Sequence, residues 1–340
     1  MTYFCQFVTL FSIHLQKNCY TMTKQSLISL FLASLLLVTG CKNGNEEPAR
    51  PFPTPQVPAM LGSNLQQAFQ YVSLHFWDKL YAPGVEYSKD TSLVMGVTPD
   101  DFEEAFATYL TALDNVTLPV MNDAQDTMLI RAARHQLSHP ESKIWKTITE
   151  LSEKYLYDPN SPYRNEEMFL PVLTHLKESP FSTEKEKTHY THLHRLCSYN
   201  RIGTPAADFK YTLKNGRTDN LHRIKAEYVL LFFSNPECQN CKEIIDALAT
   251  YPELSQLIDQ KTLVVLNIYP DADLAEWYDY LQNYPENWIN GYDQDLALNM
   301  QTIYNIRAIP SLYLLDKDKN VIFKDAPPEK IISWLTRIAD

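Results

Sequence analysis

Residues 228–242 read YVLLFFSNPECQNCK. The first six residues form a continuous apolar run, which predicts a buried central strand. A helical pattern follows the second cysteine and reaches about Ala249. We therefore expect Cys238 at the N-terminus of a helix, where unpaired backbone N–H groups and the helix dipole favour a thiolate. Cys241, one turn further on, is placed to resolve a mixed disulfide, so this stretch indicates thiol–disulfide exchange.

The residues on both sides of this stretch predict an α/β region. Strands are expected over residues 209–213, 262–269, 311–315 and 321–324, and helices over residues 272–283, 295–304 and 328–338. From residue 228 the order is strand, helix, strand, helix, strand, strand, helix, with the C-x-x-C motif at the first strand-to-helix turn. This order is similar to that of the thioredoxin fold, and the resemblance implies a central mixed sheet.

Ile309-Pro310 precedes the strand predicted over residues 311–315, about 70 residues after the C-x-x-C motif. Thioredoxin-fold proteins place a cis-proline at this point, so the resemblance implies a cis bond at Pro310, packed against the disulfide. Because proline has no N–H group, it does not block the sulfur, and the backbone at Ile309 can pair with an extended substrate. Glu237, directly before the first cysteine, completes the candidate substrate groove.

Two other interpretations of the C-x-x-C motif stay open. The pair could be half of a zinc site, although no second C-x-x-C and no matching histidine pair follows it. The pair could also be a structural disulfide without redox activity. We expect neither a metal nor another cofactor.

Residues 200–209, NRIGTPAADF, with the strand and the C-x-x-C motif after them, resemble the start of thioredoxin-like domains of the TlpA/ResA and peroxiredoxin type. The resemblance implies redox roles for Cys238, Cys241 and Pro310. A peroxidase pattern would need Pro at position 231 and Thr or Ser at position 235. This chain has Leu231 and Asn235, so peroxide reduction is rejected as the main activity.

Other positions also depart from the pattern of that family. Glu237 stands where Trp is usual, Asn240 where Pro is common, and Phe232 where thioredoxin has a buried Asp, whereas Lys242 matches. A carboxylate beside the thiolate should raise the pKa of Cys238 and partly offset the effect of the helix.

The first half of the chain is predicted to be helical. From residue 61 to about 200, apolar residues recur at helical spacing, beginning with a stripe from Leu65 to Leu80, and Pro-containing breakers separate the stripes. Five to seven helices in a compact bundle are expected. The segments FWD (76–78), YLYDPNSP (155–162) and RNEE (164–167) are similar to a helical domain of unknown function in Bacteroidetes lipoproteins, where it precedes a thioredoxin-like domain.

Histidines in this half raise the possibility of a metal site. His135 and His139 are four residues apart, and a second group gathers within nine residues, namely His189, His192, His194 and Cys197. The second group spreads around its helix instead of along one line, so solvated or packed histidines are the better account. Cys197 falls on an apolar stripe and is expected in the core.

The N-terminus has the features of a lipoprotein signal. Residues 22–41 read MTKQSLISLFLASLLLVTGC, in which a 12-residue run of apolar and small residues is too short to span a bilayer. The run ends in a sequence that resembles a bacterial lipobox, with Cys41 as the lipidated residue. An ordinary signal peptide with a chance cysteine is the alternative. The polar, proline-rich segment after Cys41 is expected to be a tether, and residues 1–21 to be a start-site artefact.

Composition excludes several classes of protein. Among 340 residues, 30 are Lys or Arg and 41 are Asp or Glu, which gives a formal net charge of −11. No dense basic block is present, so a nucleic-acid partner is not expected. The eight glycines stand apart from one another, and no phosphate-binding glycine loop exists.

The sequence therefore predicts an α+β chain of two domains, an all-α helical bundle and a thioredoxin-like α/β domain. The expected boundaries are a signal region over 1–40, the lipidated Cys41 and tether over 41–60, the helical domain over 61–199 and the thioredoxin-like domain over 200–340. The preferred function is a lipid-anchored thiol–disulfide oxidoreductase of the cell envelope, on the outer membrane facing the periplasm or the surface.

Protein thiols or disulfides would be the substrates of that enzyme, and an electron donor or acceptor of unknown identity would be its redox partner. The alternative is a redox-silent scaffold whose helical domain recognises a protein or an envelope ligand. A labile disulfide with an exposed Cys238 distinguishes the first hypothesis from the second.

Overall fold

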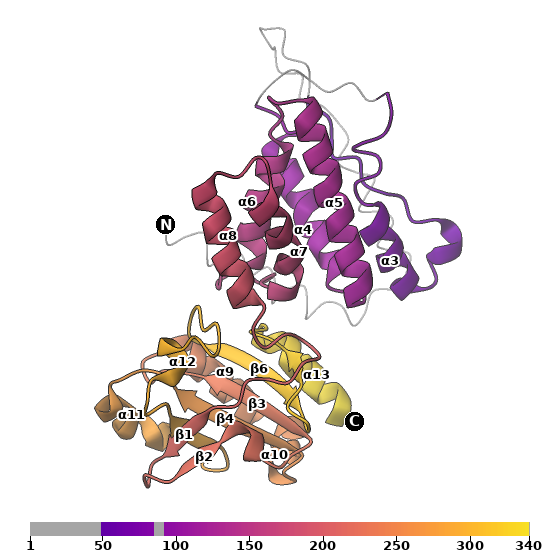
Figure 1. The fold of residues 1–340 in the computed structure, drawn as a ribbon. Coiled ribbons are helices and arrows are strands. Elements are labelled where there is room, and N and C mark those ends of the chain that lie inside the picture. The colour runs from indigo at the N-terminus through magenta and orange to yellow at the C-terminus, as the bar shows by residue number, and fades with distance from the viewer. Residues whose placement is uncertain (1–48, 85–91, 340) are drawn as a thin grey trace, which may run out of the picture. The chain divides into compact units, whose positions relative to one another are not determined.

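The structure, a computed structural model, describes residues 49–84 and 92–339 (Figure 1). These residues belong to one compact unit that begins at Glu47. The predicted signal region, the candidate lipidation residue Cys41 and the first part of the tether lie outside the described residues. Within the described ranges, no helix combines the length and the apolar character needed to cross a membrane.

The first half of the described chain is all-helical, as predicted. Six α-helices are described between residues 49 and 199, after a short 3-10 helix, η1 (Ala59–Leu61): α3 (Leu65–His75), α4 (Pro99–Leu113), α5 (Leu118–Ser138), α6 (Ile144–Leu156), α7 (Glu166–Glu178) and α8 (Glu184–Cys197). Side chains at the N-caps fix where several of them begin. Thr98 accepts a hydrogen bond from the Asp101 N–H, and Thr183 forms a reciprocal capping box with Glu186.

One buried apolar cluster holds these helices together, with an aromatic group at its centre. Phe76, Trp77, Phe102, Phe106 and Tyr109 are all buried, and neighbouring rings lie between 5.2 and 6.4 Å apart. The Trp77–Tyr109 pair is edge-to-face, an arrangement that adds stability beyond the apolar area that it buries.

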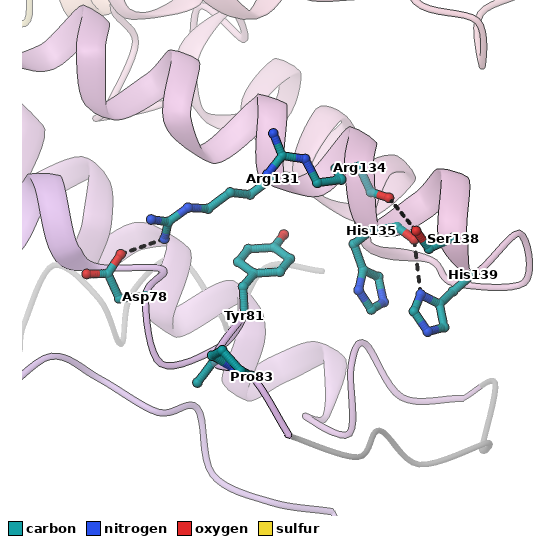
Figure 2. A pocket seen from close by; sticks show the side chains of 9 residues that line it. Asp78, Tyr81, Pro83, Arg131, Arg134, His135, Ser138 and His139 are labelled. Atoms are coloured by element: carbon teal, nitrogen blue, oxygen red, sulfur yellow. Dashed lines mark hydrogen bonds and ion pairs between the residues drawn. The ribbon is translucent and has the colours of Figure 1, made fainter.

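Two details differ from the sequence-based expectation. Leu65, which begins the first apolar stripe, is 73% exposed because it is the first residue of α3. Helix α5 is 21 residues long, yet no apolar stripe predicted it. Its buried face alternates the large apolar residues Met121, Met128 and Leu129 with two alanines and Gln125, whose amide donates to the Met168 carbonyl. Half of the buried positions therefore carry no large apolar side chain. Arg131 on α5 also binds Asp78, which follows α3, with Nη1 2.5 Å from Oδ1 (Figure 2).

The second half is built on one mixed sheet of seven strands in the order β2-β1-β5-β4-β3-β6-β7. The strands are β1 (Lys210–Leu213), β2 (Thr218–Asn220), β3 (Tyr228–Phe233), β4 (Leu263–Tyr269), β5 (Ile289–Tyr292), β6 (Ser311–Asp316) and β7 (Val321–Phe323). Central strand β3 pairs in parallel with β4 and antiparallel with β6. The predicted mixed sheet and its central strand are thereby confirmed.

The α-helices of this half are α9 (Gln239–Thr250), α10 (Pro252–Asp259), α11 (Leu274–Tyr280), α12 (Ala297–Met300) and α13 (Pro328–Ala339), with 3-10 turns η2 (Leu221–Arg223) and η3 (Leu281–Asn283). The sheet has an apolar cluster on each face. Leu230 and Phe232 of β3 belong to one cluster, and Val229, Leu231 and Phe233 belong to the other. Burial on both faces explains why β3 is a continuous apolar run.

Several elements of this half were missed or overextended. Strand β5 and helix α10 were not predicted, and the helix predicted over residues 295–304 shrinks to α12. Leu296 and Thr302 have φ values of 51° and 49°, in the left-handed region, so a right-handed helix cannot continue through them. Strand β5 reads INGY, which carries no alternating apolar pattern.

Candidate redox site

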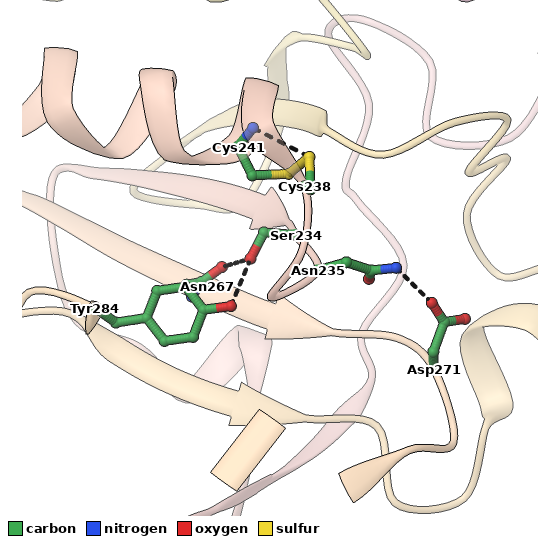
Figure 3. Close-up of a disulfide and its surroundings, with 7 residues drawn as sticks. All are labelled: Ser234, Asn235, Cys238, Cys241, Asn267, Asp271 and Tyr284. Atoms are coloured by element: carbon green, nitrogen blue, oxygen red, sulfur yellow. Dashed lines mark hydrogen bonds between the residues drawn. A yellow bond between two sulfur atoms is a disulfide. The ribbon is translucent and has the colours of Figure 1, made fainter. Parts of the chain in front are cut away.

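Cys238 and Cys241 form a disulfide at the point where β3 gives way to α9 (Figure 3). The chain turns after Phe233, and the Cys238 N–H donates to the Asn235 carbonyl at 3.2 Å. Cys238 is the N-cap of α9, and its Sγ accepts a hydrogen bond from the Cys241 N–H at 3.1 Å. The helix terminus therefore points a backbone donor at the first sulfur, the arrangement that stabilises a thiolate once the bond is reduced.

The two sulfurs differ in their access to solvent. Cys238 is half-buried between exposed neighbours, Glu237 and Gln239, whereas Cys241 is 1% exposed. An incoming thiol or disulfide can reach Cys238 and not Cys241. This division of access is what exchange through a mixed disulfide needs, because the outer sulfur attacks and the inner one resolves.

The candidate groove residues Ile309 and Pro310 lie at the same end of strands β3 and β6 as the disulfide. The Ile309–Pro310 peptide bond is cis, as the resemblance implied. Ser311, the next residue, pairs with Phe233 at the end of β3, five residues before Cys238. Ile309 and Cys238 both pack against the apolar cluster that contains Cys241. The structure thus brings together the predicted residues Cys238, Cys241, Ile309 and Pro310.

A neutral polar network lies beside the disulfide, and sequence reasoning missed it. Ser234 Oγ donates to Asn267 Oδ1 at 2.5 Å and lies 3.5 Å from the Tyr284 hydroxyl (Figure 3). Burial raises the pKa of Tyr284, although Ser234 and Asn267 act in the opposite direction. The available signal was Asn267, a polar residue inside the otherwise apolar strand β4. Phe232, which stands where thioredoxin has a carboxylate, packs instead against Trp288.

Carboxylates surround the exposed side of the site. Asn235, three residues before Cys238, donates a hydrogen bond from Nδ2 to Asp271 at 2.8 Å. Desolvation, followed by the charges of Glu237, Asp273 and Asp271, raises the pKa of Glu276 above its ordinary value. Glu237 and the two aspartates therefore lie close enough to Glu276 for their charges to act on it.

A cavity of about 490 Å³ adjoins Cys238. Glu237, Lys242 and Asp246 contribute charged groups to its lining, and Tyr280 contributes an aromatic ring. The cavity therefore lies beside the first sulfur, on its accessible side. The chemistry that such a pair of cysteines suits is thiol–disulfide exchange.

A second cavity, of about 510 Å³, lies in the helical region (Figure 2). Its lining includes Arg131, Arg134, His135 and His139, and the two imidazole rings stack at 4.2 Å between centroids. Burial, followed by the charge of His139, lowers the pKa of His135. None of the redox residues lines this cavity. In the part of the chain that the structure describes, no group of three His, Cys, Asp or Glu side chains is arranged to hold a metal ion.

Comparison with known proteins identifies the family of this chain. A family model described as a domain of unknown function, DUF5106, matches residues 16–200, more than half of the chain. A crystal structure of a thioredoxin-like protein from Bacteroides caccae ATCC 43185 is 38% identical to this chain. It covers 85% of this chain and 99% of its own, with a TM-score of 0.73. The chain belongs to the DUF5106 family.

This DUF5106 protein has a second family match, described as thioredoxin-like, over residues 226–321. The C-terminal domain of an uncharacterised protein from Bacteroides fragilis NCTC 9343 is 44% identical and covers 40% of this chain and 97% of its own, with a TM-score of 0.39. The thioredoxin domain of a thiol-disulfide oxidoreductase from Bacteroides vulgatus is 16% identical and covers 41% of this chain and 99% of its own, with a TM-score of 0.37. No curated protein matches the chain.

The expected combination of a helical domain of unknown function and a thioredoxin-like domain is thus confirmed, and the helical domain is of the DUF5106 family. Cys197, expected in the core, is buried and is the free cysteine among the described residues. Burial, followed by the charge of Glu166, raises the pKa of its thiol, so it stays protonated and unreactive at neutral pH.

Proposed function

We propose that this DUF5106 protein is an extracytoplasmic, lipid-anchored thiol–disulfide oxidoreductase. One observation carries the proposal. Cys238 caps α9, is half-buried and opens onto a cavity, while its disulfide partner Cys241 is buried directly behind it. A disulfide that served only as a staple would not need one sulfur at a helix N-terminus and open to a partner.

In the reducing direction the Cys238 thiolate attacks one sulfur of a substrate disulfide, and the substrate S–S bond breaks. A mixed disulfide forms, and the first substrate thiol leaves with a proton. The Cys241 thiolate then attacks Cys238 Sγ, releases the second substrate thiol and closes the Cys238–Cys241 bond. Two electrons pass from the protein dithiol to the substrate disulfide, and the reverse sequence oxidises a substrate dithiol.

The segment around Pro310 would hold the substrate during these steps. Pro310 has no N–H group, and the backbone at Ile309 can pair with an extended polypeptide beside Cys238. Glu237 lies at the mouth of the cavity and adds negative charge there. We propose that protein segments, not small thiols alone, are the substrates.

The proposed location rests on sequence. Residues 22–40 would be a lipoprotein signal peptide and Cys41 the lipidated residue, so the protein would be anchored in the cell envelope. Replacing Cys41 by Ser should move the chain from the membrane fraction to the soluble fraction and abolish labelling with an alkyne-tagged fatty acid. Unchanged labelling of the variant would contradict this assignment.

The experiment for the redox function is the reduction potential of the Cys238–Cys241 pair in the full chain. Thiol alkylation in glutathione and dithiothreitol buffers would measure it, with Cys238→Ser and Cys197→Ser variants to assign the thiols. A potential between about −120 and −270 mV, the span of known exchange proteins, is expected. A potential below about −300 mV would identify a structural disulfide and favour the redox-silent scaffold instead.

A further inference from the structure

Two adjacent carboxylates at the start of α7, Glu166 and Glu167, are almost fully buried, with exposures of 3% and 2%. Carboxylates in the first turn of a helix are ordinary, because the helix dipole favours them, but they are normally solvated. The side chains of these two residues instead bind residues of the thioredoxin-like region. The two carboxylates bind different segments of that region.

Glu166 binds the segment that leads to Pro310. Its Oε1 accepts a hydrogen bond from Asn305 Nδ2 at 2.6 Å and lies 3.3 Å from Arg307 Nε. Its Oε2 lies 2.7 Å from Lys324 Nζ, just after β7. The side chains of Arg307 and Lys324 are 8% and 2% exposed, so these charges have little solvent to replace a lost partner.

The same segment has a second anchor. Arg307 Nη2 donates to Asp325 Oδ2 at 2.6 Å, and Asp325 Oδ1 accepts from the Ser311 hydroxyl at 2.9 Å. Arg307 also donates to the carbonyl of Tyr157, and its guanidinium lies 4.5 Å from the centroid of the Tyr157 ring. Burial alone would lower the pKa of Arg307, but Asp325 and Glu166 hold it above its usual value.

The segment needs such anchors because it has little structure of its own. Residues 301–310 contain neither helix nor strand, so no backbone ladder fixes them. Their position depends on side-chain contacts, and the buried charges among those contacts cannot be left unpaired cheaply. Tyr304, buried in the core with its hydroxyl on the Ala207 carbonyl, holds the first part of the segment. Ionic contacts from the helical region hold the part that follows, from Asn305 to Arg307, which leads to Pro310.

Glu167 makes no such contact. Its Oε2 accepts from Arg201 Nη2 at 2.6 Å, and its Oε1 accepts from the Ile202 N–H at 3.0 Å. Both partners lie at the start of the thioredoxin-like region, a few residues after α8. Glu167 is thus a control that matches Glu166 in chemistry, helix position and burial, and differs in not contacting the segment before Pro310.

We propose that Glu166 is a positioning residue of the redox site, by which the helical domain holds residues 305–310 in the conformation that receives a polypeptide substrate. The helical domain is then a part of the substrate groove and not a separate module. This inference rests on the proposed oxidoreductase function for its kinetic consequence, whereas its structural consequence is independent of that function.

The test compares Glu166→Gln with Glu167→Gln in the full chain. Amide hydrogen–deuterium exchange over residues 303–311 should become at least about tenfold faster in Glu166→Gln, which corresponds to about 1.4 kcal/mol, and stay unchanged in Glu167→Gln. Asn305→Ala removes the 2.6 Å contact without leaving a charge unpaired. It should change exchange in the same direction and provides the measurement if Glu166→Gln does not fold.

The kinetic arm uses the reduced chain and a disulfide-linked peptide pair carrying a fluorophore and a quencher. Glu166→Gln should raise the KM for the peptide about tenfold with kcat little changed. The reduction potential of the cysteine pair and the rate at which dithiothreitol reduces the Cys238–Cys241 disulfide should stay at wild-type values. Glu167→Gln should leave all of these unchanged. Equal effects of the two variants on peptide KM and on exchange at residues 303–311 would overturn the proposal. A wild-type chain that reacts neither with the peptide nor with dithiothreitol would contradict the oxidoreductase function instead. The amide hydrogen–deuterium exchange measurement would still decide the role of Glu166.

Discussion

At Cys238 two local electrostatic effects oppose each other. The N-terminus of α9 directs the Cys241 N–H at Cys238 Sγ, which favours the thiolate. The exposed carboxylate of Glu237, the residue before Cys238, disfavours the thiolate. Asp271, Asp273 and Glu276 add negative charge nearby. Because like charge disfavours ionisation, we expect these carboxylates to make the reduced Cys238 thiol less reactive than the helix N-terminus alone would make it.

We therefore expect Glu237→Gln to lower the pKa of the reduced Cys238 thiol by roughly half a unit, since it removes an adjacent negative charge. The pH dependence of alkylation of the reduced chain by iodoacetamide, followed by mass spectrometry, measures this. Glu253→Gln, which removes a half-buried carboxylate in the first turn of α10, serves as the control. A Glu237→Gln profile that overlays the wild-type profile would show that solvent screens the charge completely.

Residues also mark where sequence reasoning stops. The cysteines, Ile309 and Pro310 were found because each carries a motif with a fixed spacing. Ser234, Asn267 and Tyr284 carry no motif, and they meet only because β3, β4 and the loop after η3 converge. Glu166 and Glu167 were noted only as part of the RNEE segment that resembles a family, and only the tertiary structure reveals their ionic partners.

At the scale of elements, helices α4 and α6 are joined by one carboxylate. Glu103 Oε1 accepts from Lys154 Nζ at 2.5 Å and from the Tyr155 hydroxyl at 2.6 Å. These hydrogen bonds outweigh desolvation and lower the pKa of Glu103 below its ordinary value of 4.5. A lowered carboxylate pKa adds stability above the unfolded-state pKa, and this stability is lost as the pH falls through the folded-state pKa.

Glu103→Gln should therefore lower the free energy of unfolding by about 0.5 kcal/mol at pH 7, a value discounted for the partial exposure of the site. The difference from wild type should shrink as the pH falls below 4.5, the ordinary value of this carboxyl. Urea unfolding at several pH values measures it. Glu104→Gln, the exposed neighbour, should show no such trend, and a pH-independent difference for Glu103→Gln would refute the electrostatic account.

The segment before η1 packs on the helical core through the ring of Phe52. Phe52 lies 5.3 Å from Phe76, 5.6 Å from Trp77 and 5.7 Å from Phe102 between ring centroids. Nearby, Arg50 donates to the Met95 carbonyl at 2.9 Å. The described part of the proline-rich segment therefore contacts the helical core, although it contains no helix or strand before Ala59.

Phe52→Ala should destabilise the helical region by about 2 kcal/mol, less than for a fully buried Phe because Phe52 is half-buried. Chemical unfolding followed by Trp fluorescence measures the loss. Gln56→Ala, at an exposed position of the same segment, is the control. Equal stability of the two variants would mean that the ring contacts are offset by the entropy of ordering the segment.

At the scale of the whole molecule, two lysines of the thioredoxin-like region bind carboxylates of the helical region. Lys324 is buried, and its Nζ contacts Glu166 and donates to the carbonyls of Cys197 and Tyr199. Lys330 on α13 binds Asp114 at 2.6 Å, with side-chain exposures of 38% and 42%. The two pairs have the same chemistry and differ in burial.

We expect Lys324→Met to lower the free energy of unfolding by about 3 kcal/mol, because it leaves Glu166 buried without its closest cation. Lys330→Met should cost less than about 1 kcal/mol, because its pair is exposed. The double variant Glu166→Gln/Lys324→Met should lose less than the sum of the single losses, since the two side chains interact directly. Equal losses for Lys324→Met and Lys330→Met in thermal unfolding would refute the importance of burial.

The sequence by itself determined the elements whose signals are local. Apolar periodicity identified most helices, the continuous run identified the central strand, and the cysteine spacing with Ile309-Pro310 identified the redox residues. Only the tertiary structure decided which neutral groups lie beside the disulfide, how Phe52 joins the helical core, and which charges cross between the two regions. The reason is physical, since periodicity and motifs are properties of neighbours along the chain. The partner of a buried charge is chosen by whichever distant segment brings a compensating charge into hydrogen-bonding distance.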